Sequence, residues 1–221
     1  MHDAHYADED RSRVRRLPER GSRERALVHA ILDEGFLCHV GFATDEGPVV
    51  IPTLYARDGE RLYLHGSPAS RMLRTLGKGV PVCITVTHLD GLVLARSAFH
   101  HSVNYRSAVI FGSARELADL AEKRRALDVI VEHVVPGRTP GTRGPNEFET
   151  KYTRVLAVEI EQASAKVRTG GPKDDAEDMA LPHWAGVVPL RLVPGTPVPD
   201  AALPEGAAVP EYLAAYRRPG S

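Results

Sequence analysis

Two tight turns in the first third of the chain constrain the fold most strongly. The turns at 44–48 and 57–60 separate three short segments rich in strand-forming residues, at 36–43, 49–56 and 62–65. Turns of this length join antiparallel strands, because a parallel neighbour needs a crossover connection of a dozen or more residues. The three segments are therefore expected to form an antiparallel meander, and a doubly wound parallel sheet is disfavoured.

Later segments carry the same kinds of signal. β-branched residues predict further strands at 80–87, 92–98, 106–114 and 153–160. Helices are expected from Ser22 to Gly35, from Ser67 to Gly77 and from Asp119 to Pro136. The first is predicted to turn Ala26, Leu27, Ala30 and Ile31 inward, and the second Met72, Leu73 and Leu76. Asp90-Gly91 is expected to end a strand, and 137–150 is expected to be a long loop. We therefore expect a mainly β protein, an antiparallel barrel of about six to seven strands, closed on itself, with helices at its edges.

One globular unit accounts for most of the chain. The 221 residues are 43% hydrophobic, which is enough to bury one core. Residues 1–20 are predicted to be a flexible charged arm, residues 21–195 the folded domain and residues 196–221 a Pro/Ala-rich tail. Cys38 and Cys83 each lie in a strand-like apolar segment and are expected to be buried thiols.

Charge and hydropathy restrict the partners. The formal net charge is -1 and the pI is about 6.8, so the overall charge does not attract nucleic acid or an anionic membrane. No apolar segment reaches the length of a membrane span, and the N-terminus lacks a signal-peptide pattern. We expect a cytoplasmic protein that binds a small molecule.

The segment 61–71 predicts a site for an anion. A strand-like stretch is followed by Gly66, which permits close backbone approach, and then by a Ser-Pro pair that favours the start of a helix. The first turn of such a helix presents free N–H groups, to which Ser67, Ser70 and Arg71 add two hydroxyl groups and one charge. These groups suit a phosphate. In the alternative interpretation, Ser67 only caps a surface helix and Arg71 is solvated.

Other candidate ligand groups are scattered along the chain. Thr53 and Tyr55 share one face of a strand that is expected to pair with 62–65, so they are predicted to line a pocket, unless Tyr55 is an ordinary half-buried aromatic. Lys166 would add positive charge near the end of the last strand, where exposed cations are also common. Trp184, the only tryptophan, suits either the wall of a planar ligand site or a plug over one end of the barrel.

The segment 100–107 is the most polar stretch between two predicted strands. So many donors are costly to bury unless they meet a ligand or a partner, and we favour ligand contact. His100 and His101 are adjacent and would point to opposite sides, and no third ligand has suitable spacing, so a metal is not expected.

The common hydrolase, NTPase, zinc-protease and Rossmann motifs do not occur in the sequence. Any redox chemistry would therefore come from a bound cofactor.

Three segments in order resemble the pyridoxamine 5′-phosphate oxidase-like flavoproteins, and more narrowly the branch that includes the nitroimidazole-resistance proteins. They are Ile-Pro-Thr-Leu-Tyr at 51–55, Leu-His-Gly-Ser-Pro-Ala-Ser-Arg at 64–71 and His-Ser-Val-Asn-Tyr-Arg-Ser at 101–107. The resemblance covers residues 15 to 195, approximately. It implies a split β-barrel and a homodimer that holds FMN at its interface.

The resemblance assigns a role to each matching position. The phosphate of FMN would be bound around Gly66 by His65, Ser67, Ser70 and Arg71. The flavin ring and ribityl chain would lie along Pro52, Thr53, Leu54 and Tyr55. The other subunit would contribute Asn104, Tyr105, Arg106 and Ser107, and Trp184 would lie near the flavin. The true oxidase has a basic residue at the position of Tyr55, and its C-terminal substrate-binding set is missing here, so oxidation of vitamin B6 is not expected.

The resulting hypothesis is an FMN-dependent oxidoreductase that acts on a small substrate such as a nitroaromatic compound. Tyr105 and His101 are the candidates for proton transfer. The alternative is a non-catalytic flavin- or haem-binding protein on the same barrel, with His65, His100 and His101 as candidate iron ligands. A deazaflavin in place of FMN is also left open.

Overall fold

A computed structural model describes residues 3–217. The fold is dominated by one sheet of ten strands, and every pairing in it is antiparallel. The strands are β1 (Gly21–Ser22), β2 (Leu37–Thr44), β3 (Gly47–Leu54), β4 (Ala56–Asp58), β5 (Arg61–Gly66), β6 (Pro81–Leu94), β7 (Ser102–Glu116), β8 (Arg154–Glu159), β9 (Gln162–Arg168) and β10 (Gly186–Pro189). The α-helices are α1 (Arg25–Glu34), α2 (Arg71–Leu76), α3 (Leu120–Val134), α4 (Glu147–Lys151) and α5 (Glu211–Ala214). Short 3₁₀ helices occur at Pro18–Arg20, Ala98–His100, Thr139–Gly141 and Ala176–Ala180.

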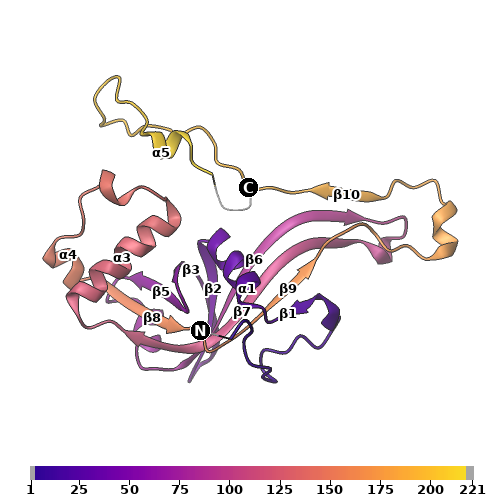
Figure 1. Cartoon of the computed structure of the whole chain (residues 1–221), viewed down its shortest axis with the longest axis horizontal. Coiled ribbons are helices and arrows are strands. Elements are labelled where there is room, and N and C mark those ends of the chain that lie inside the picture. Colours follow the sequence, from indigo (N-terminus) through magenta and orange to yellow (C-terminus); the bar gives the residue numbers. More distant parts are fainter. Residues whose placement is uncertain (1–2, 218–221) are drawn as a thin grey trace.

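The main path of the sheet runs β3-β2-β6-β7-β8-β5-β4, and β9 and β10 pair with β7 and β6 beside it. Within residues 3–217 no pairing joins β3 to β4, so the sheet is curved but open. The expectation of a closed barrel is therefore wrong, whereas the split β-barrel implied by the resemblance is confirmed. The long hairpin of β6 and β7 spans most of the molecule, and α3 lies near the opposite end from the hairpin tip (Figure 1).

The core lies inside the curved sheet. Alternate residues of β2 and β6, among them Val40, Ile84 and Val86, point inward and are buried with Val28 and Ile31 of α1. A smaller cluster joins α3 to β5 and β8 through Ala126, Ile130, Tyr63 and Val155. Burial of these apolar side chains is the main stabilising contribution to the fold.

Several strand predictions need correction. The segments 80–87 and 92–98 were expected to be separate strands, but β6 continues through both with a bulge between Leu89 and Gly91. A bulge absorbs one extra residue without ending the strand, so the Asp-Gly pair is not a turn here. Strand 51–55 was expected to pair with 62–65, yet among the described residues β3 pairs with β2 alone, and β5 pairs with β4 and β8. Strands β9 and β10 were not anticipated as separate elements.

The helix starts also differ in part from expectation. Helix α2 begins three residues later than predicted, because Ser70, and not Ser67, is the N-cap and accepts from the backbone N–H of Leu73. Its expected inward residues, Met72, Leu73 and Leu76, are buried as predicted. Helix α1 begins at Arg25 without a capping side chain. It buries Val28, Ile31 and Leu32, so its buried face differs from the predicted one and shares only Ile31 with it.

Two further helical expectations concern the second half of the chain. Asp119 caps α3 as predicted, accepting from the backbone N–H of Glu122 at 2.8 Å. The loop expected at 137–150 contains α4, which begins with a capping box between Asn146 and Glu149.

The N-terminal segment packs on the domain through Tyr6. The sequence suggested an arm without structure of its own, but Tyr6 is only 2% exposed and belongs to the main core cluster. Its hydroxyl donates to Glu60 at 2.7 Å, and the guanidinium of Arg25 lies over its ring. The expectation of a loose arm is corrected at this point, because burial of the Tyr6 ring stabilises the segment even though its neighbours are charged.

The C-terminal segment also returns to the domain. After β10 it crosses above the sheet to α5 (Figure 1). The hydroxyl of Tyr216 donates to the carbonyl of Val134 at 2.8 Å, and Arg138 donates to the hydroxyl of Tyr212 at 2.6 Å. The predicted tail therefore has two anchor points near its end, and its last four residues, 218–221, lie outside the described residues.

Among residues 3–217, none of the helices has the length and apolar character needed to cross a bilayer.

Candidate functional site

The turn between β5 and α2 holds the predicted phosphate-binding residues close together in the chain. Ser67 accepts from the backbone N–H of Ala69 at 3.2 Å, and Ser70 caps α2, so each hydroxyl group keeps its hydrogen to donate. The side chain of Arg71 is 62% exposed, and its nearest carboxylate, on Glu46, lies 3.7 Å away and is itself 86% exposed. An ion pair this exposed is weak, so the charge of Arg71 is available to an anion.

His65 ends β5 just before this turn and has an unusual environment. Its ring is half-buried, and its Nδ1 atom is buried without a hydrogen-bond partner among the described residues. Burial lowers the pKa of His65, so the imidazole is held in its neutral form. A buried polar atom without a partner is costly, and a ligand that reached Nδ1 would remove that cost.

The strand predicted to lie along the flavin divides between two faces. Pro52 and Leu54 are exposed on the outer face of β3, whereas Thr53 is half-buried on the inner one. Tyr55 is fully buried and donates its hydroxyl to the carbonyl of Leu32 at 2.6 Å. The prediction that Tyr55 lines a ligand pocket is therefore corrected, because its ring is buried in the core and its hydroxyl is hydrogen-bonded to a backbone carbonyl.

The polar residues at the start of β7 are bound mainly to their own chain. Asn104 is buried, donates to the carbonyl of Gly170 at 3.1 Å and accepts from Arg168. The hydroxyl of Ser107 donates weakly to the carbonyl of Lys166 at 3.4 Å. Tyr105 is half-buried and is paired with Arg168 across the β7–β9 ladder. Asn104 and Ser107 thus have partners within their own chain, while ligand contact by the segment 100–107 stays a prediction.

The remaining predicted residues lie away from the β5–α2 turn. Lys166 donates to the backbone carbonyl of Arg16, so its ammonium group binds the N-terminal segment. Trp184 is 65% exposed, and its ring lies against Gly186 at the start of β10. His101 is exposed at the end of the β6–β7 hairpin, and the carbonyl of Ser97 lies 3.1 Å from its Nδ1.

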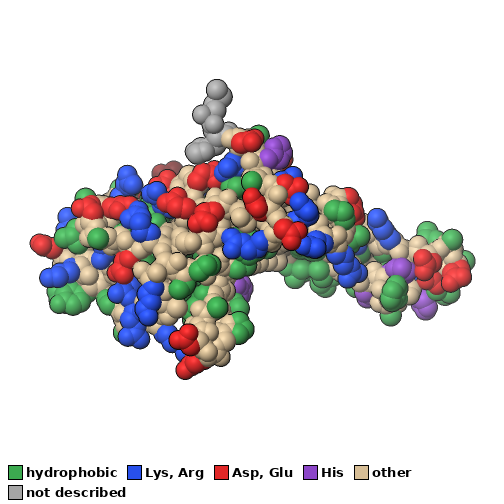
Figure 2. Space-filling view, turned by 90° about the horizontal axis from the view of Figure 1, so that it is seen from below, with side chains coloured by type: hydrophobic (Ala, Val, Ile, Leu, Met, Phe, Trp, Pro, Cys, Tyr) green, Lys and Arg blue, Asp and Glu red, His purple; other side chains and the backbone are tan. Residues whose placement is uncertain are grey.

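These groups do not converge within one chain. Strand β5 lies toward one end of the sheet, while β10, which pairs with β6 beside the start of β7, lies toward the other (Figure 1). The end of the molecule that carries the hairpin tip shows histidine, acidic and hydrophobic side chains together (Figure 2). His100 contacts Asp175 there at 3.0 Å. The predicted groups therefore lie in two separate parts of the described chain.

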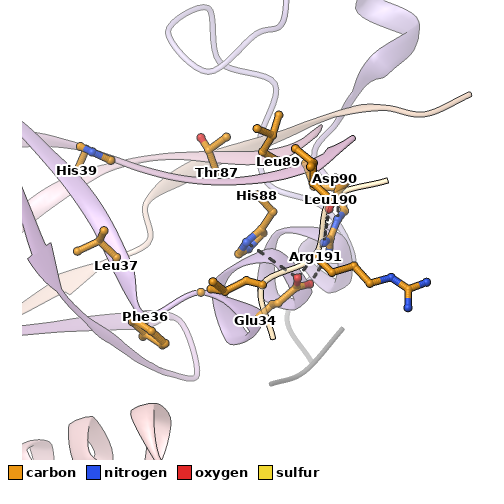
Figure 3. A pocket seen from close by; sticks show the side chains of 13 residues that line it. Glu34, Phe36, Leu37, His39, Thr87, His88, Leu89, Asp90, Leu190 and Arg191 are labelled. Atoms are coloured by element: carbon orange, nitrogen blue, oxygen red, sulfur yellow. Dashed lines mark hydrogen bonds and ion pairs between the residues drawn. The ribbon is translucent and has the colours of Figure 1, made fainter. Parts of the chain in front are cut away.

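A cavity of about 490 Å³ was missed by sequence reasoning. It lies between the outer face of the sheet, the end of α1 and the segment that follows β10 (Figure 3). Its lining residues are Glu34, Gly35, Phe36, Leu37, His39, Thr87, His88, Leu89, Asp90, Arg106, Leu190, Arg191 and Leu192. Of these residues, Arg106 alone is predicted from the sequence as a candidate site residue. The acidic Asp90 next to Gly91, in the bulge, is the sequence signal that could have indicated the cavity.

Arg106 is the centre of an ion network on the wall of this cavity. Its guanidinium donates to both oxygens of Glu34 and to both oxygens of Asp90. The hydrogen bonds that Arg106 donates to Glu34, and then those to Asp90, raise the pKa of Arg106. His88 donates from Nε2 to the carbonyl of Ile31 at 2.9 Å, and its Nδ1 lies 4.0 Å from Glu34. The guanidinium of Arg106, which the resemblance places in the segment that reaches FMN from the other subunit, is therefore already paired within its own chain.

The cavity borders the strand that the resemblance assigns to the flavin. In the β2–β3 ladder, Leu37 is paired with Leu54 and His39 with Pro52, and both β2 residues line the cavity. Cross-strand partners of this kind lie side by side on one face. The exposed side of β3 and the cavity are therefore neighbouring parts of one surface.

Within residues 3–217, no group of three or more His, Cys, Asp and Glu side chains is arranged to hold a metal ion.

Comparison with known proteins agrees with this architecture. Residues 24–167 match the family described as pyridoxamine 5′-phosphate oxidase. This chain belongs to that family. A comparison with curated proteins found no match.

Three solved structures are similar over long stretches. The flavocytochrome Anf3 from Azotobacter vinelandii is 39% identical, with a TM-score of 0.89, and the match covers 96% of this chain and 99% of that one. The FAD and haem binding protein from Mycobacterium smegmatis is 37% identical, with a TM-score of 0.85 and coverage of 88% and 96%. A structure described as a 5-nitroimidazole antibiotic resistance protein from Bacteroides thetaiotaomicron is 27% identical, with a TM-score of 0.57 and coverage of 66% and 86%.

Proposed function

We propose that this protein is a flavin-binding oxidoreductase. The observation that carries the proposal is the β5–α2 turn, which brings the exposed charge of Arg71, two serine hydroxyl groups and the unpartnered Nδ1 of His65 within one short stretch of chain. The family and the two long structural matches, one to a flavocytochrome and one to an FAD and haem binding protein, support a flavin as the ligand.

The residues of the turn fit a phosphate group. Arg71 would neutralise part of its charge, and Ser67 and Ser70 would donate hydroxyl hydrogens to its oxygens. Pro52 and Leu54 leave an apolar exposed face on β3 against which a flat ring would pack. A bound flavin would supply the electron-transfer chemistry, while these side chains would bind and orient it.

FMN is the flavin that the sequence resemblance favours, and FAD is the one named for the mycobacterial relative. Both have a phosphate next to the ribityl chain, so the β5–α2 turn suits either. We keep a small substrate such as a nitroaromatic compound as the proposed electron acceptor, supported by the similarity to the 5-nitroimidazole resistance protein.

A second candidate function adds haem to the flavin. It is favoured by His65, because a neutral imidazole is the form that ligates haem iron and its Nδ1 atom has no partner among the described residues. The two long structural matches, to a flavocytochrome and to an FAD and haem binding protein, also support it. His100 and His101, the other histidines considered from the sequence, contact Asp175 and the carbonyl of Ser97 and are less available.

The site would be completed by a homodimer. The outer face of β2, β3 and β6 exposes Leu37, Val50, Leu54 and Leu89, which are between 39% and 65% exposed. A second copy packed on this face would bury it and would bring β7 of one chain toward β3 of the other. This proposal explains why the groups predicted for one site are separated in a single chain.

Release of the bound molecule tests the proposed function. Purified protein would be heat-denatured, and the supernatant separated by chromatography against FMN, FAD, riboflavin and haemin standards. A flavin at near-equimolar yield supports the proposal and identifies which flavin is bound. A flavin-free supernatant, from protein that also fails to take up added FMN or FAD, would contradict it.

A further inference from the structure

We propose that the cavity beside Arg106 binds an organic cation with an apolar body, and that the small substrate of this protein, a nitroaromatic compound included, carries such a cationic group. The name substrate rests on the proposed flavin function, whereas the charge and shape preference rests on the cavity alone. Its volume of about 490 Å³ falls within the range of small-molecule pockets, about 300–1,000 Å³.

The ionised groups on the inner wall of the cavity leave an excess of negative charge. Glu34 and Asp90 are both paired with the single guanidinium of Arg106, so the network keeps one uncompensated negative charge. The three side chains are between 15% and 31% exposed, which limits screening by solvent. His88 lies close to Glu34, but its Nε2–H donates to the carbonyl of Ile31.

The other cation in the lining does not cancel this charge. Arg191 is exposed on the segment after β10, and its side chain extends away from Glu34 and His88 (Figure 3). A phosphate or carboxylate inside the cavity would therefore lie beside the carboxylates of Glu34 and Asp90 and be repelled by them. A cationic group would be attracted by the excess negative charge of Glu34 and Asp90.

Beside the polar side chains of His39, Thr87 and His88, the lining carries a group of apolar side chains that suits a flat or aliphatic body. Phe36 and Leu37 come from the entry to β2, Leu89 from β6, and Leu190 and Leu192 from the segment that covers the cavity. The backbone N–H of Leu190 donates to the carbonyl of Asp90 at 3.0 Å, which holds the covering segment beside the acidic group. The ligand would thus be enclosed between apolar walls with its charge directed to Glu34 and Asp90.

The position of the cavity links it to the proposed flavin. Leu37 and His39 line it, and they are the ladder partners of Leu54 and Pro52 on β3. A molecule in the cavity would lie next to a ring packed on the exposed side of β3. Adjacency of this kind is what electron transfer between two bound molecules requires.

Equilibrium dialysis with two coloured probes tests the charge preference. Methylene blue is a flat organic cation, and indigo disulfonate is a flat anion of related size. We expect the protein to bind methylene blue and to bind indigo disulfonate much more weakly. Tighter binding of the anion would overturn the proposal.

Three variants test the place of binding. Glu34→Gln and Asp90→Asn remove the excess charge and should each weaken methylene blue binding roughly ten-fold. Arg106→Gln raises the negative charge and should tighten the binding, which a merely structural role would not do. Glu147→Gln, at the exposed start of α4, makes the same charge change elsewhere and should leave binding unchanged. Equal affinity in the Glu34 and Glu147 variants, with both folded by circular dichroism, would refute the assignment.

The same samples separate this inference from the proposed function. The flavin content of each is read from its absorbance before dye is added. Selective dye binding by a flavin-free protein supports the cavity assignment and overturns its role as a substrate site. A flavin-containing protein that binds neither dye overturns the cavity assignment and leaves the flavin site standing.

Discussion

Arg106 donates to both carboxylate oxygens of Asp90, from Nε at 2.9 Å and from Nη2 at 2.8 Å. The two residues lie on neighbouring strands at the bulge of β6, and the same guanidinium also binds Glu34 at the end of α1. The network therefore ties the bulge to a helix. It also fixes the acidic wall of the cavity.

Replacing Arg106 should destabilise the protein. Arg106→Gln leaves two half-buried carboxylates near each other without their cation, and we expect a loss of roughly 2–3 kcal/mol in the free energy of unfolding, less than for a fully buried pair. Urea denaturation at neutral pH measures it. Arg115→Gln, which removes an exposed pair with Glu122, should cost less than about 1 kcal/mol. Equal losses in the two variants would show that the Arg106 network contributes no more to the free energy of unfolding than an exposed ion pair does.

The charge of Arg71 should contribute directly to flavin binding. Arg71→Ala is expected to weaken the affinity by about 1.5–3 kcal/mol, the usual contribution of charge-assisted hydrogen bonds. Fluorescence titration of flavin-depleted protein measures this change. Arg74→Ala, also exposed in α2, serves as the matched control and should leave the affinity intact. An unchanged affinity in the Arg71 variant would remove the phosphate assignment.

His65 should be required for haem but less so for the flavin. His65→Leu removes the unpartnered Nδ1 atom while keeping an apolar side chain of similar size. We expect loss of the Soret band after reconstitution with haemin, while flavin is still bound. His101→Leu is the control at an exposed position. Retention of a normal Soret band in the His65 variant would exclude His65 as an iron ligand.

The outer face of β3 should hold two copies together. Val50 is 65% exposed on this face, and Val50→Glu would place a charge in the proposed interface. Analytical ultracentrifugation should then show a dimer for the unaltered protein and a monomer with reduced flavin content for the variant. Val198→Glu, in the C-terminal segment at 90% exposure, should stay dimeric. A monomeric unaltered protein with full flavin content would contradict the shared site.

Acid should destabilise the fold through two histidines. Burial lowers the pKa of His65, and burial followed by the charge of Arg57 lowers that of His29. Below the ordinary value of about 6.5, the unfolded chain therefore binds more protons than the folded one, so stability falls as the pH drops. Thermal melts between pH 7.5 and pH 5, roughly, should show this decrease, and His65→Leu should make it smaller. An identical pH profile in the variant would show that His65 does not contribute.

Local patterns in the sequence predicted much of the fold, because alternation and capping act over a few residues. The capping of α3 by Asp119 and the inward face of α2 are correct for this reason. The bulge in β6 was read as a turn, since an Asp-Gly pair has the same local signature in both settings. The pairing of β3 with β2 alone depends on long-range contacts that no local pattern records.

The candidate site was predictable only in part. The β5–α2 turn is a candidate on the sequence alone, because hydroxyl groups, a glycine and an arginine follow one another in the chain. The Arg106 network was missed because Glu34, Asp90 and Arg106 are far apart in sequence and meet only after α1, β6 and β7 pack. Tyr55 was misassigned because its acceptor, the carbonyl of Leu32, belongs to a helix whose position was unknown.

The absorbance spectrum of the purified protein, before and after incubation with added flavin, tests the central claim most directly. We predict the two visible bands of a bound flavin, with a Soret band in addition where haem is present. A colourless protein that also leaves added FMN and FAD free in solution would contradict flavin binding, and with it the roles given to Arg71 and to the exposed face of β3.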